Sequence, residues 1–424
     1  MTSGQTLAQP RKSLWQQPSF LGLWTSETIS SFGAQFTELA IPLTAVLVLS
    51  ASPTELGFLN AALTAPFLLL SLYAGVWVDR HKRRRIMILS NIGRALLLAI
   101  VPLTVLGGIL SITALLGIAF LVGSLRVFFD IAYQSYLPSI VEKEQLVDAN
   151  SRLEASRAVS SVAGPGLAGF VIQLVTAPFA LACDITSFLS STLILSRIKD
   201  REESSSNNGR SMLSDAREGL SVVANDPRLR SLAGVGALAN FFEFSIMAMF
   251  LLYAVHVLGL QPEGLGIVLS VGALGAVAGA FSAGKLSDRF GIGPAIILSL
   301  ALGAIVWGPL IYLATPATAT VLLILAWFCG ELSFVSYSIN QSSFRQAICP
   351  ARLQGRVNAT MRFLSAGMVP LGSIAGGLLG QFLGLRLAIG IASIGLLLSP
   401  VWLVLSPVRR LKQVQESESP TSNC

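Results

Sequence analysis

Seven ionisable side chains stand inside otherwise apolar segments, and these are the residues best placed to do chemistry: Glu27, Glu38, Arg126, Asp130, Asp184, Glu243 and Glu331. A charge at the centre of a lipid bilayer costs about 2.5–3.5 kcal/mol, so each residue needs a compensating role. A carboxylate in such a place can bind and release a proton or another cation. We therefore expect a role in proton coupling or substrate contact, set against the alternative of structural ion pairs.

Spacing places four of these residues on two shared helix faces. Glu27 and Glu38 are separated by about three helical turns with only about 20° of drift, so both can face one cavity. Glu38 is the deeper of the two, whereas Glu27 could instead reach the membrane surface. Arg126 and Asp130 stand at i, i+4 and can pair, which makes their burial tolerable. The pair has either a role in proton coupling or a purely structural role as an ion pair.

The other three carboxylates differ in depth. Asp184 stands near the start of its apolar run (178–197), towards the expected periplasmic end, and there we expect a structural role. Glu243 and Glu331 are near the middle of theirs, and the polar residues that follow Glu331 suit a substrate cavity. Arg94 is close enough to one end of its run to extend its guanidinium to the surface. Four aromatic residues could either line a pocket or pack between helices: Phe128, Phe129, Tyr133 and Tyr136.

Composition assigns these residues to a membrane protein. Only 12% of the 424 residues are charged and 53% are hydrophobic, whereas a soluble protein carries about 25% charge. A helix needs roughly 20 apolar residues to cross the hydrocarbon core. Twelve runs meet this requirement: 20–49, 56–78, 86–107, 111–138, 156–175, 178–197, 231–258, 264–286, 294–314, 318–340, 360–381 and 386–406. We therefore predict an all-α membrane protein with twelve spans.

Positive charge predicts the orientation. The net charge is +7, and nearly all of the 29 Lys and Arg residues fall in alternate loops, including GVWVDRHKRRR at 75–85. Cationic loops stay in the cytoplasm, so both termini are expected there. This pattern makes a nucleic-acid partner a poor interpretation of the basic cluster. No cysteine or histidine spacing predicts a metal site.

A polar segment divides the chain into two sets of six spans. The predicted organisation is a cytoplasmic tail (1–19), an N-terminal bundle (20–197), a cytoplasmic loop (198–230) with a short surface helix starting near Ser214, a C-terminal bundle (231–406) and a cytoplasmic tail (407–424). A motif recurs at matching places in the two halves, as GVWVDR from Gly75 and GKLSDR from Gly284. Repeated halves are typical of transporters.

With these motifs the chain resembles the major facilitator superfamily, whose loop signature is roughly G-x-L-a-D-R-x-G-R-K. The resemblance implies two pseudo-symmetric six-helix bundles and a cytoplasmic gate latch made by the signature loops. The alternative is ordinary topogenic loop charge. The matching positions are Gly75, Asp79, Arg80, Arg83 and Arg84 in the first copy, and Gly284, Asp288, Arg289 and Gly291 in the second.

Further stretches resemble the drug and siderophore exporter branch, among them FFDIAYQSYLPSIV (128–141), SFRQAICP (343–350) and GRVNATMR (355–362). GPGLAG (164–169) resembles an antiporter-associated helix motif at Gly164, Pro165 and Gly169, although Ser160 and Ala168 replace two of its glycines. Small residues at these places also suit plain helix packing. For Arg126 the branch implies a proton relay.

The resemblance implies a proton-coupled exporter of small amphipathic molecules in the bacterial inner membrane, working by alternating access. The alternatives are a solute importer of the same fold and a transport-inactive sensor. An enzyme is disfavoured because the chain has only 2 histidines and no dense catalytic constellation. We expect a monomer whose partners are the lipid bilayer, a small-molecule substrate and protons, with the proton gradient as driving force and no cofactor.

Overall fold

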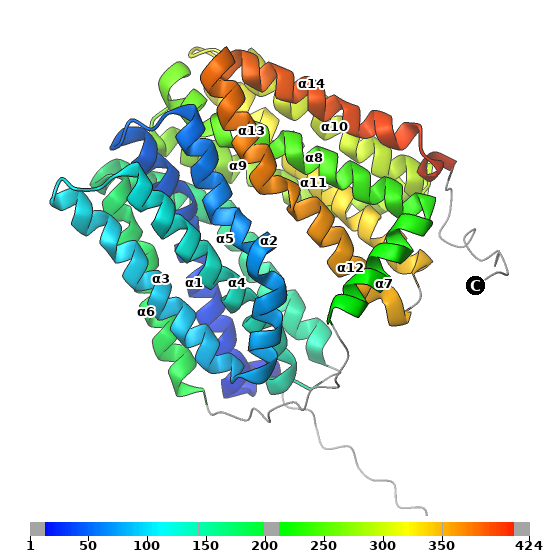
Figure 1. The fold of residues 1–424 in the computed structure, drawn as a ribbon, viewed down its shortest axis with the longest axis horizontal. Coiled ribbons are helices and arrows are strands. Elements are labelled where there is room, and N and C mark those ends of the chain that lie inside the picture. The colour runs from blue at the N-terminus through cyan, green and yellow to red at the C-terminus, as the bar shows by residue number, and fades with distance from the viewer. Residues whose placement is uncertain (1–12, 143–144, 199–211, 350, 411–424) are drawn as a thin grey trace, which may run out of the picture.

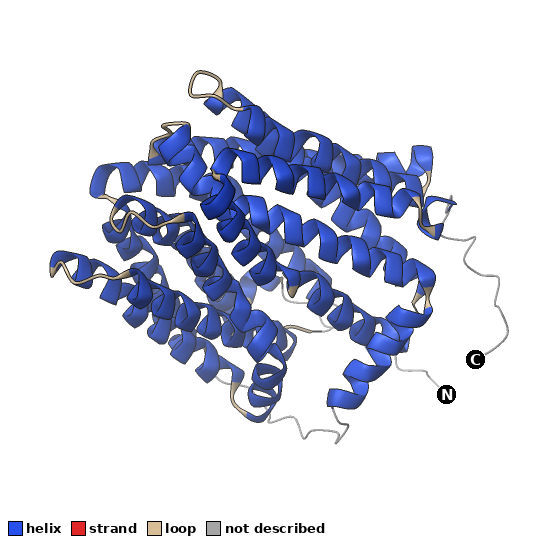
Figure 2. Ribbon diagram, turned by 45° about the horizontal axis from the view of Figure 1, so that its top comes forward, coloured by secondary structure: helices blue, strands red, loops and turns tan. Residues whose placement is uncertain are grey.

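The computed structural model describes residues 13–142, 145–198, 212–349 and 351–410. These residues form helices joined by short turns, with no strand in the described ranges (Figure 2). Much of the predicted loop 198–230 and of the tails 1–19 and 407–424 lies outside them.

Six long helices form the N-terminal bundle: α1 (Pro18–Leu47), α2 (Pro53–Arg80), α3 (Arg83–Leu106), α4 (Ile112–Ile140), α5 (Leu146–Val175) and α6 (Ala177–Arg197). A short 3₁₀ turn (Leu14–Gln16) precedes them. The start of α2 shows how the sequence sets these limits. Ser52 accepts from the backbone N–H of Glu55 at 3.3 Å, and Glu55 accepts from the N–H of Ser52 at 2.7 Å. This reciprocal capping satisfies donors that the first helical turn leaves unpaired.

The C-terminal bundle is built from α8 (Pro227–Leu252), α9 (Pro262–Phe290), α10 (Ile292–Leu313), α11 (Ala319–Ile348), α12 (Ala351–Ala366), α13 (Met368–Leu383) and α14 (Leu385–Val404). A π-helical turn (Tyr253–Val257) extends α8, and a 3₁₀ turn (Pro407–Arg410) follows α14.

The prediction of an all-α, twelve-span protein is confirmed. Within the described ranges, eleven helical spans are long and apolar enough to cross a membrane. The twelfth is α1, whose 30 residues have the required length but include Glu27, Glu38 and several hydroxyl side chains. Some helices begin or end well beyond the predicted limits, as α5 does at Leu146 and α11 at Ile348. Helices continue past the hydrocarbon core, where apolar composition no longer marks them.

The eleventh span is broken in the middle, which the apolar run 360–381 did not predict. Helix α12 ends at Ala366 and α13 begins at Met368, with Gly367 between them. Pro370 explains the break, because its ring lacks an N–H and collides with the carbonyl four residues earlier. Two half-helices therefore share one span.

The predicted surface helix is present as α7 (Met212–Asn225). The helix begins at Met212, so Ser214, the residue near which its start was predicted, lies within its first turn. Helix α7 packs on α12: Arg356 forms an ion pair with Glu218, and Val223 is buried in the same cluster as Val357. A Cβ atom on Gly219 would lie 2.7 Å from the carbonyl oxygen of Arg356, so the two backbones approach closely. This helix belongs to the C-terminal bundle.

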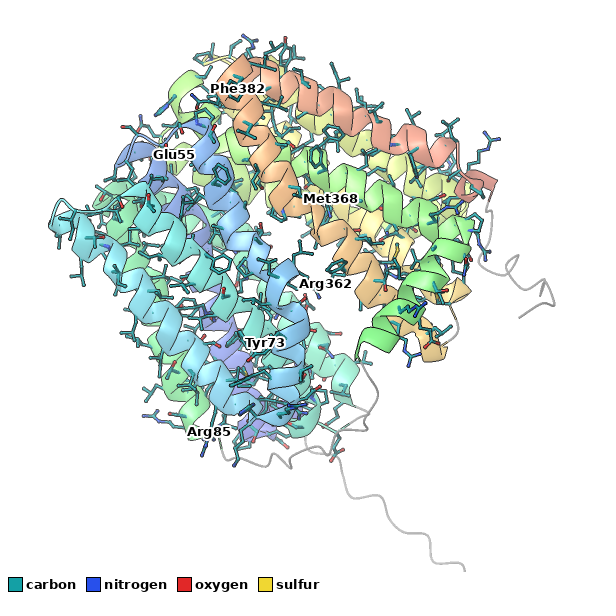
Figure 3. The ribbon with its side chains drawn as sticks, in the orientation of Figure 1. Glu55, Tyr73, Arg85, Arg362, Met368 and Phe382 are labelled. Atoms are coloured by element: carbon teal, nitrogen blue, oxygen red, sulfur yellow. The ribbon has the colours of Figure 1, made fainter. Side chains whose placement is uncertain are left out.

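The two bundles touch at one end, which we call the neutral end because its turns carry almost no charge. Gly57 of α2 meets Gly377 of α13 there, and Gly169 of α5 meets Gly266 of α9. Glu55 and Phe382 lie at this end (Figure 3). Gly166 also donates its backbone N–H to Ser270 Oγ at 2.7 Å, a hydrogen bond between the bundles.

At the opposite end the bundles part (Figure 1). We call it the basic end, since Arg80 to Arg85, Lys285, Arg289 and Arg345 lie there. The buried apolar clusters follow the same division. One cluster joins both bundles, with members such as Leu56 and Met249. The second belongs only to the N-terminal bundle and the third only to the C-terminal bundle. The buried apolar core that the two bundles share therefore does not continue to the basic end.

Candidate functional site

A cavity of about 820 Å³ lies against the C-terminal bundle, between α8, α10, α11 and the α12–α13 break. Pockets for drug-sized molecules usually fall between about 300 and 1,000 Å³. The lining runs from Trp307, near the middle of the bundle, to Arg345 and Asn358, near the basic end. The cavity is thus large enough for a small organic molecule and is reached from the basic end.

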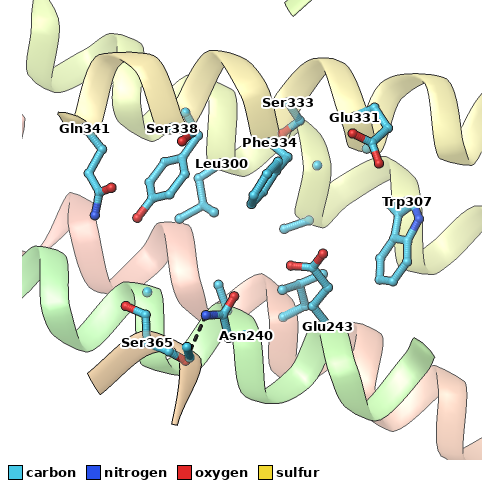
Figure 4. A pocket seen from close by; sticks show the side chains of 18 of the residues that line it. Asn240, Glu243, Leu300, Trp307, Glu331, Ser333, Phe334, Ser338, Gln341 and Ser365 are labelled. Atoms are coloured by element: carbon cyan, nitrogen blue, oxygen red, sulfur yellow. Dashed lines mark hydrogen bonds between the residues drawn. The ribbon is translucent and has the colours of Figure 1, made fainter. Parts of the chain in front are cut away.

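Glu243 and Glu331 project into this cavity from opposite walls (Figure 4). Glu243 comes from α8 and Glu331 from α11. Neither carboxylate has an ion-pair or hydrogen-bond partner within the described ranges. Over the same ranges, no three His, Cys, Asp or Glu side chains gather as they would around a metal ion. The described residues therefore supply no cation to pair with either carboxylate.

The inner part of the cavity has an aromatic wall. Trp307 and Trp327 are almost fully buried, with ring centroids 5.6 Å apart. The glycine before Glu331 makes room for one of them, because a Cβ atom on Gly330 would lie 2.7 Å from Trp307 Cδ1. Glu331 is therefore adjacent to an indole ring. Aromatic faces attract cations and bury apolar groups.

Towards the basic end the lining becomes cationic and polar. Arg345 donates to Ser342 Oγ at 3.2 Å, and Arg362 stacks on Phe67 of α2 with its guanidinium 4.8 Å from the ring centroid. Asn240 donates to the carbonyl oxygen of Ser365 at 2.8 Å, which joins α8 to the end of α12. Arg362 thus contributes to the cavity and also contacts the other bundle.

In the N-terminal bundle, Arg126 joins two of the predicted carboxylates. Its Nη1 donates to Glu38 Oε1 at 3.2 Å, and its Nε lies 4.0 Å from Asp130 Oδ2. All three side chains are about half exposed in the isolated chain. The predicted Arg126–Asp130 pair is present, and Glu38 is a closer partner that spacing could not predict. The carboxylate of Glu38 therefore has a cation beside it, unlike those of Glu243 and Glu331.

Asp184 is fully buried at the α1–α6 contact. Its Oδ2 accepts from Thr37 and its Oδ1 accepts from Ser187 Oγ at 2.9 Å. A buried carboxylate with two donors is tolerable in an apolar bundle. This environment is consistent with the structural role expected for Asp184.

The expectation that Arg94 extends to the surface is wrong. Arg94 is only 6% exposed, with its guanidinium 4.1 Å from the Phe188 ring centroid and 4.8 Å from that of Phe129. It donates to Asn91 Oδ1 at 2.5 Å. Helix α3 turns this side chain towards α6 and α4 rather than along its own axis. Two aromatic faces partly replace the water that the guanidinium loses.

Glu27 is also buried, with only 8% of its surface exposed. It accepts from Arg157 Nη2 of α5 at 2.9 Å, and the guanidinium of Arg157 lies over the Tyr133 ring at 5.0 Å. Its other oxygen, Oε2, is buried without a hydrogen-bond partner. The sequence did not indicate Arg157 as a partner of Glu27, because Arg157 stands at the start of a predicted span, where a cation usually sets the orientation of the helix.

The aromatic residues of the fourth span pack inside the N-terminal bundle. Phe129, Tyr133 and Tyr136 are buried in one cluster, while Phe128 contacts Tyr73 at 6.4 Å. Of the two interpretations left open, packing describes their environment. The cavity wall instead comes from tryptophans in α10 and α11, and isolated tryptophans within apolar runs have no distinguishing spacing.

The first signature loop closes the end of α2 and opens α3. Gly75, Asp79 and Arg80 lie in the last turns of α2, with Asp79 and Arg80 exposed, and Arg83 begins α3. Arg84 donates to the carbonyl oxygen of Ile198 at the end of α6. The loop therefore ties three helices of its own bundle at the basic end.

The second signature loop occupies the matching place in the other bundle. Gly284, Asp288 and Arg289 are exposed near the end of α9. Gly291 ends that helix with φ of 88°, a value that favours glycine. No ion pair joins the two loops within the described residues. The predicted latch is thus unformed here, as expected where the bundles part.

The GPGLAG residues of α5 face two different neighbours. A Cβ atom on Gly164 would lie 2.3 Å from Gln35 Cγ of α1. Pro165 presents its carbonyl oxygen to Gly266, and Gly169 meets Gly266 at its Cα atom. The motif therefore forms part of the contact between bundles at the neutral end.

Comparison with known proteins agrees with this architecture. The sequence profile described as transmembrane secretion effector matches residues 12–423. The multidrug efflux pump Tap of Mycolicibacterium fortuitum is 29% identical over 392 residues, which cover 88% of this chain and 92% of Tap. Macrolide efflux protein A of Streptococcus pyogenes is 22% identical over 381 residues, covering 87% and 90% of the two chains.

Solved structures share the fold. A bacterial homologue of the iron transporter ferroportin in its inward-facing state is 18% identical, with a TM-score of 0.75, and the match covers 93% of this chain and 99% of that one. The same homologue in its outward-facing state gives a TM-score of 0.61, covering 91% and 98%. The higher of these two TM-scores is that of the inward-facing structure. This chain is an integral membrane transporter that belongs to the transmembrane secretion effector family of the major facilitator superfamily.

Proposed function

We propose that the chain is a proton-driven exporter of drug-sized amphipathic molecules. The observation that carries this proposal is the cavity of about 820 Å³, with its tryptophan wall and two carboxylates that lack a protein partner. A mostly apolar cavity with a few convergent polar groups is the usual form of a small-molecule site.

The charge distribution supports an orientation for this exporter. Lys and Arg gather at the basic end, so the positive-inside rule places that end, and both termini, in the cytoplasm of a bacterial inner membrane. The open cavity then faces the cytoplasm and loads substrate from there. The relatives described as efflux pumps support the same direction. Rocking of the bundles would next open the neutral end, as in other transporters built from repeats.

Coupling to protons rests on Glu243 and Glu331. A carboxylate without a cationic partner changes the net charge of its cavity when it binds a proton. The neutral form costs less to enclose in an apolar setting, so proton binding favours one arrangement of the bundles over the other. Glu38 is less suited to this role because Arg126 already offsets its charge. In this proposal the chain works as a monomer in the bilayer, with protons and its substrate as partners.

Inverted membrane vesicles test the proposal. The vesicles are loaded with a pH-sensitive dye, energised, and then given macrolides, lipophilic cations, siderophores and zwitterionic drugs. Export predicts substrate accumulation in the vesicles with proton leakage, and both should disappear in Glu331→Gln. Glu263→Gln is the matched control, since Glu263 is exposed at the start of α9. Substrate uptake into right-side-out vesicles would indicate an importer, and substrate movement without proton leakage would overturn the coupling.

A further inference from the structure

The charges that line the cavity are separated by sign along its length. Glu243 and Glu331 lie in the deep part, beside Trp307. Arg345 and Arg362 lie towards the basic end, from which a ligand enters. On α11 alone, Glu331 and Arg345 are about 21 Å apart at 1.5 Å per residue. The acidic and the basic groups therefore lie at different depths of the cavity.

The region near Arg345 contains hydrogen-bond donors that the protein does not use. Arg345 Nε and the hydroxyl of Tyr337 are buried atoms without a hydrogen-bond partner among the residues that the structure describes. Both residues line the cavity on α11, and they are two turns apart. Leaving a buried donor unpaired costs about 1–3 kcal/mol, so a ligand that brings acceptor oxygens recovers this energy.

The deep part requires the opposite chemistry. Two carboxylates face each other across a space bounded by an indole ring, without a cation from the protein. An ammonium group there gains charge-assisted hydrogen bonds to Glu243 or Glu331 and an electrostatic contact with Trp307. The apolar wall between the two ends suits an aromatic or aliphatic body.

We propose that the cavity selects elongated zwitterionic amphipaths. The ammonium group of the ligand lies between Glu243 and Glu331, its apolar body lies along Leu300 and Phe334, and its carboxylate or other oxyanion accepts from Arg345 and Tyr337. This inference rests on the proposed function and names its substrate class. It requires that an analogue with only the cation loses the contacts with Arg345 and Tyr337, and that an analogue with only the anion loses the contacts with Glu243 and Glu331.

Binding to the purified full-length protein tests the proposal with one scaffold in three charge forms. The ligands are an extended ω-amino acid whose apolar chain is long enough to reach from Glu331 to Arg345, its methyl ester, which keeps only the cation, and its N-acetyl derivative, which keeps only the carboxylate. Calorimetry in lipid nanodiscs gives Kd without needing a proton gradient. We expect the zwitterion to bind about tenfold more tightly than either analogue, because each analogue loses one charge-assisted hydrogen bond, and tenfold in Kd corresponds to about 1.4 kcal/mol.

Variants assign each half of the recognition. Glu331→Gln should weaken the zwitterion and the ester but not the N-acetyl derivative. Arg345→Gln should weaken binding of the zwitterion and of the N-acetyl derivative but not of the ester. Arg345→Lys keeps the positive charge and should restore part of the lost affinity, which would show that the loss in Arg345→Gln is not caused by misfolding. Glu263→Gln and Arg409→Gln are controls outside the cavity, and all three affinities should stay unchanged in them.

The outcomes separate this inference from the proposed function. Equal affinity for the three ligands, or an ester that binds as tightly as the zwitterion, overturns the zwitterion selection even if transport is observed. The expected binding pattern without substrate accumulation in energised vesicles overturns the exporter and leaves the binding site standing.

Discussion

Gly57 and Gly377 are in backbone contact across the two bundles. A Cβ atom on Gly57 would lie 2.9 Å from the Cα atom of Gly377, and Gly169 and Gly266 show the same 2.9 Å approach on the other side of the molecule. Small residues allow helices to pack at this distance in lipid. Two matched glycine contacts therefore close the neutral end while the basic end is open.

Gly377→Ala should weaken this closure. The added methyl group collides with backbone atoms of α2, which cannot move aside as a side chain can, and such overpacking costs about 1–3 kcal/mol. We expect the population to shift towards the state that opens at the neutral end. Labelling of Ser373→Cys by a membrane-impermeant maleimide measures this shift, because Ser373 is fully buried in the closed contact.

The matched control for this substitution is Gly117→Ala. A Cβ atom on Gly117 meets nothing within 4 Å. Unchanged labelling in Gly377→Ala, or equal labelling in the two variants, would contradict the role of the glycine contact.

Neutralising Arg126 alone should destabilise the chain more than removing Arg126 and Glu38 together. Arg126→Gln leaves Glu38 and Asp130 without the cation between them. The double variant Arg126→Gln/Glu38→Gln removes one of the two charges left behind. We expect a coupling energy of about 0.5–3 kcal/mol in a double-mutant cycle followed by thermal unfolding in detergent. If the stability changes of the two single variants add up to that of the double variant, the Arg126–Glu38 ion pair does not contribute to stability.

Asp184→Asn should lower the stability of the folded bundle. Thr37 and Ser187 both donate to the carboxylate, and an amide presents a donor to one of them. The expected cost is about 1–3 kcal/mol, the penalty of a buried polar group without a partner. Thermal unfolding measures this loss of stability, and Thr37→Val is the second substitution of a double-mutant cycle with Asp184→Asn. A transport defect in Asp184→Asn at unchanged stability would instead assign a coupling role.

The N-terminus of α8 should lose stability in acid. Asp226 accepts from the backbone N–H of Arg228 at 2.8 Å and from its guanidinium at 2.9 Å. Burial alone would raise the pKa of Asp226, but these hydrogen bonds outweigh it and hold the pKa below the usual 3.8. A depressed pKa stabilises the folded chain above the unfolded value, and this contribution fades as the pH falls through the folded pKa.

Asp226→Ala should therefore cost about 1 kcal/mol near neutral pH, as loss of a helix cap does. The difference from the unaltered chain should shrink below about pH 4. Unfolding in detergent at a series of pH values measures it, and a difference that stays constant with pH would contradict the assignment.

Several elements of the fold follow from local sequence alone. Apolar runs of about 20 residues must cross the bilayer as helices because lipid offers no partner for backbone groups. The capping box at Ser52 and Glu55 is equally local, since its two hydrogen bonds join residues three apart. For the same reason the surface helix α7 could be predicted from its own residues.

The environment of each charged residue was beyond the sequence. Glu38 and Glu331 look alike as carboxylates in apolar runs, yet only Glu38 has a cationic partner, and that partner is on another helix. The environments of Arg94 and Arg157 could not be predicted for a similar reason. The aromatic partner of Arg94 and the acidic partner of Arg157 come from other helices.

Sequence by itself determined that this chain is a twelve-span membrane protein of two repeated halves, because bilayer thickness and loop charge act on each segment separately. Tertiary structure alone decided which end is open, which carboxylates face the cavity, and that tryptophans of α10 and α11 form its wall. These features depend on contacts between helices far apart in the chain, and a helical period describes only the face of one helix, not the neighbour that covers it.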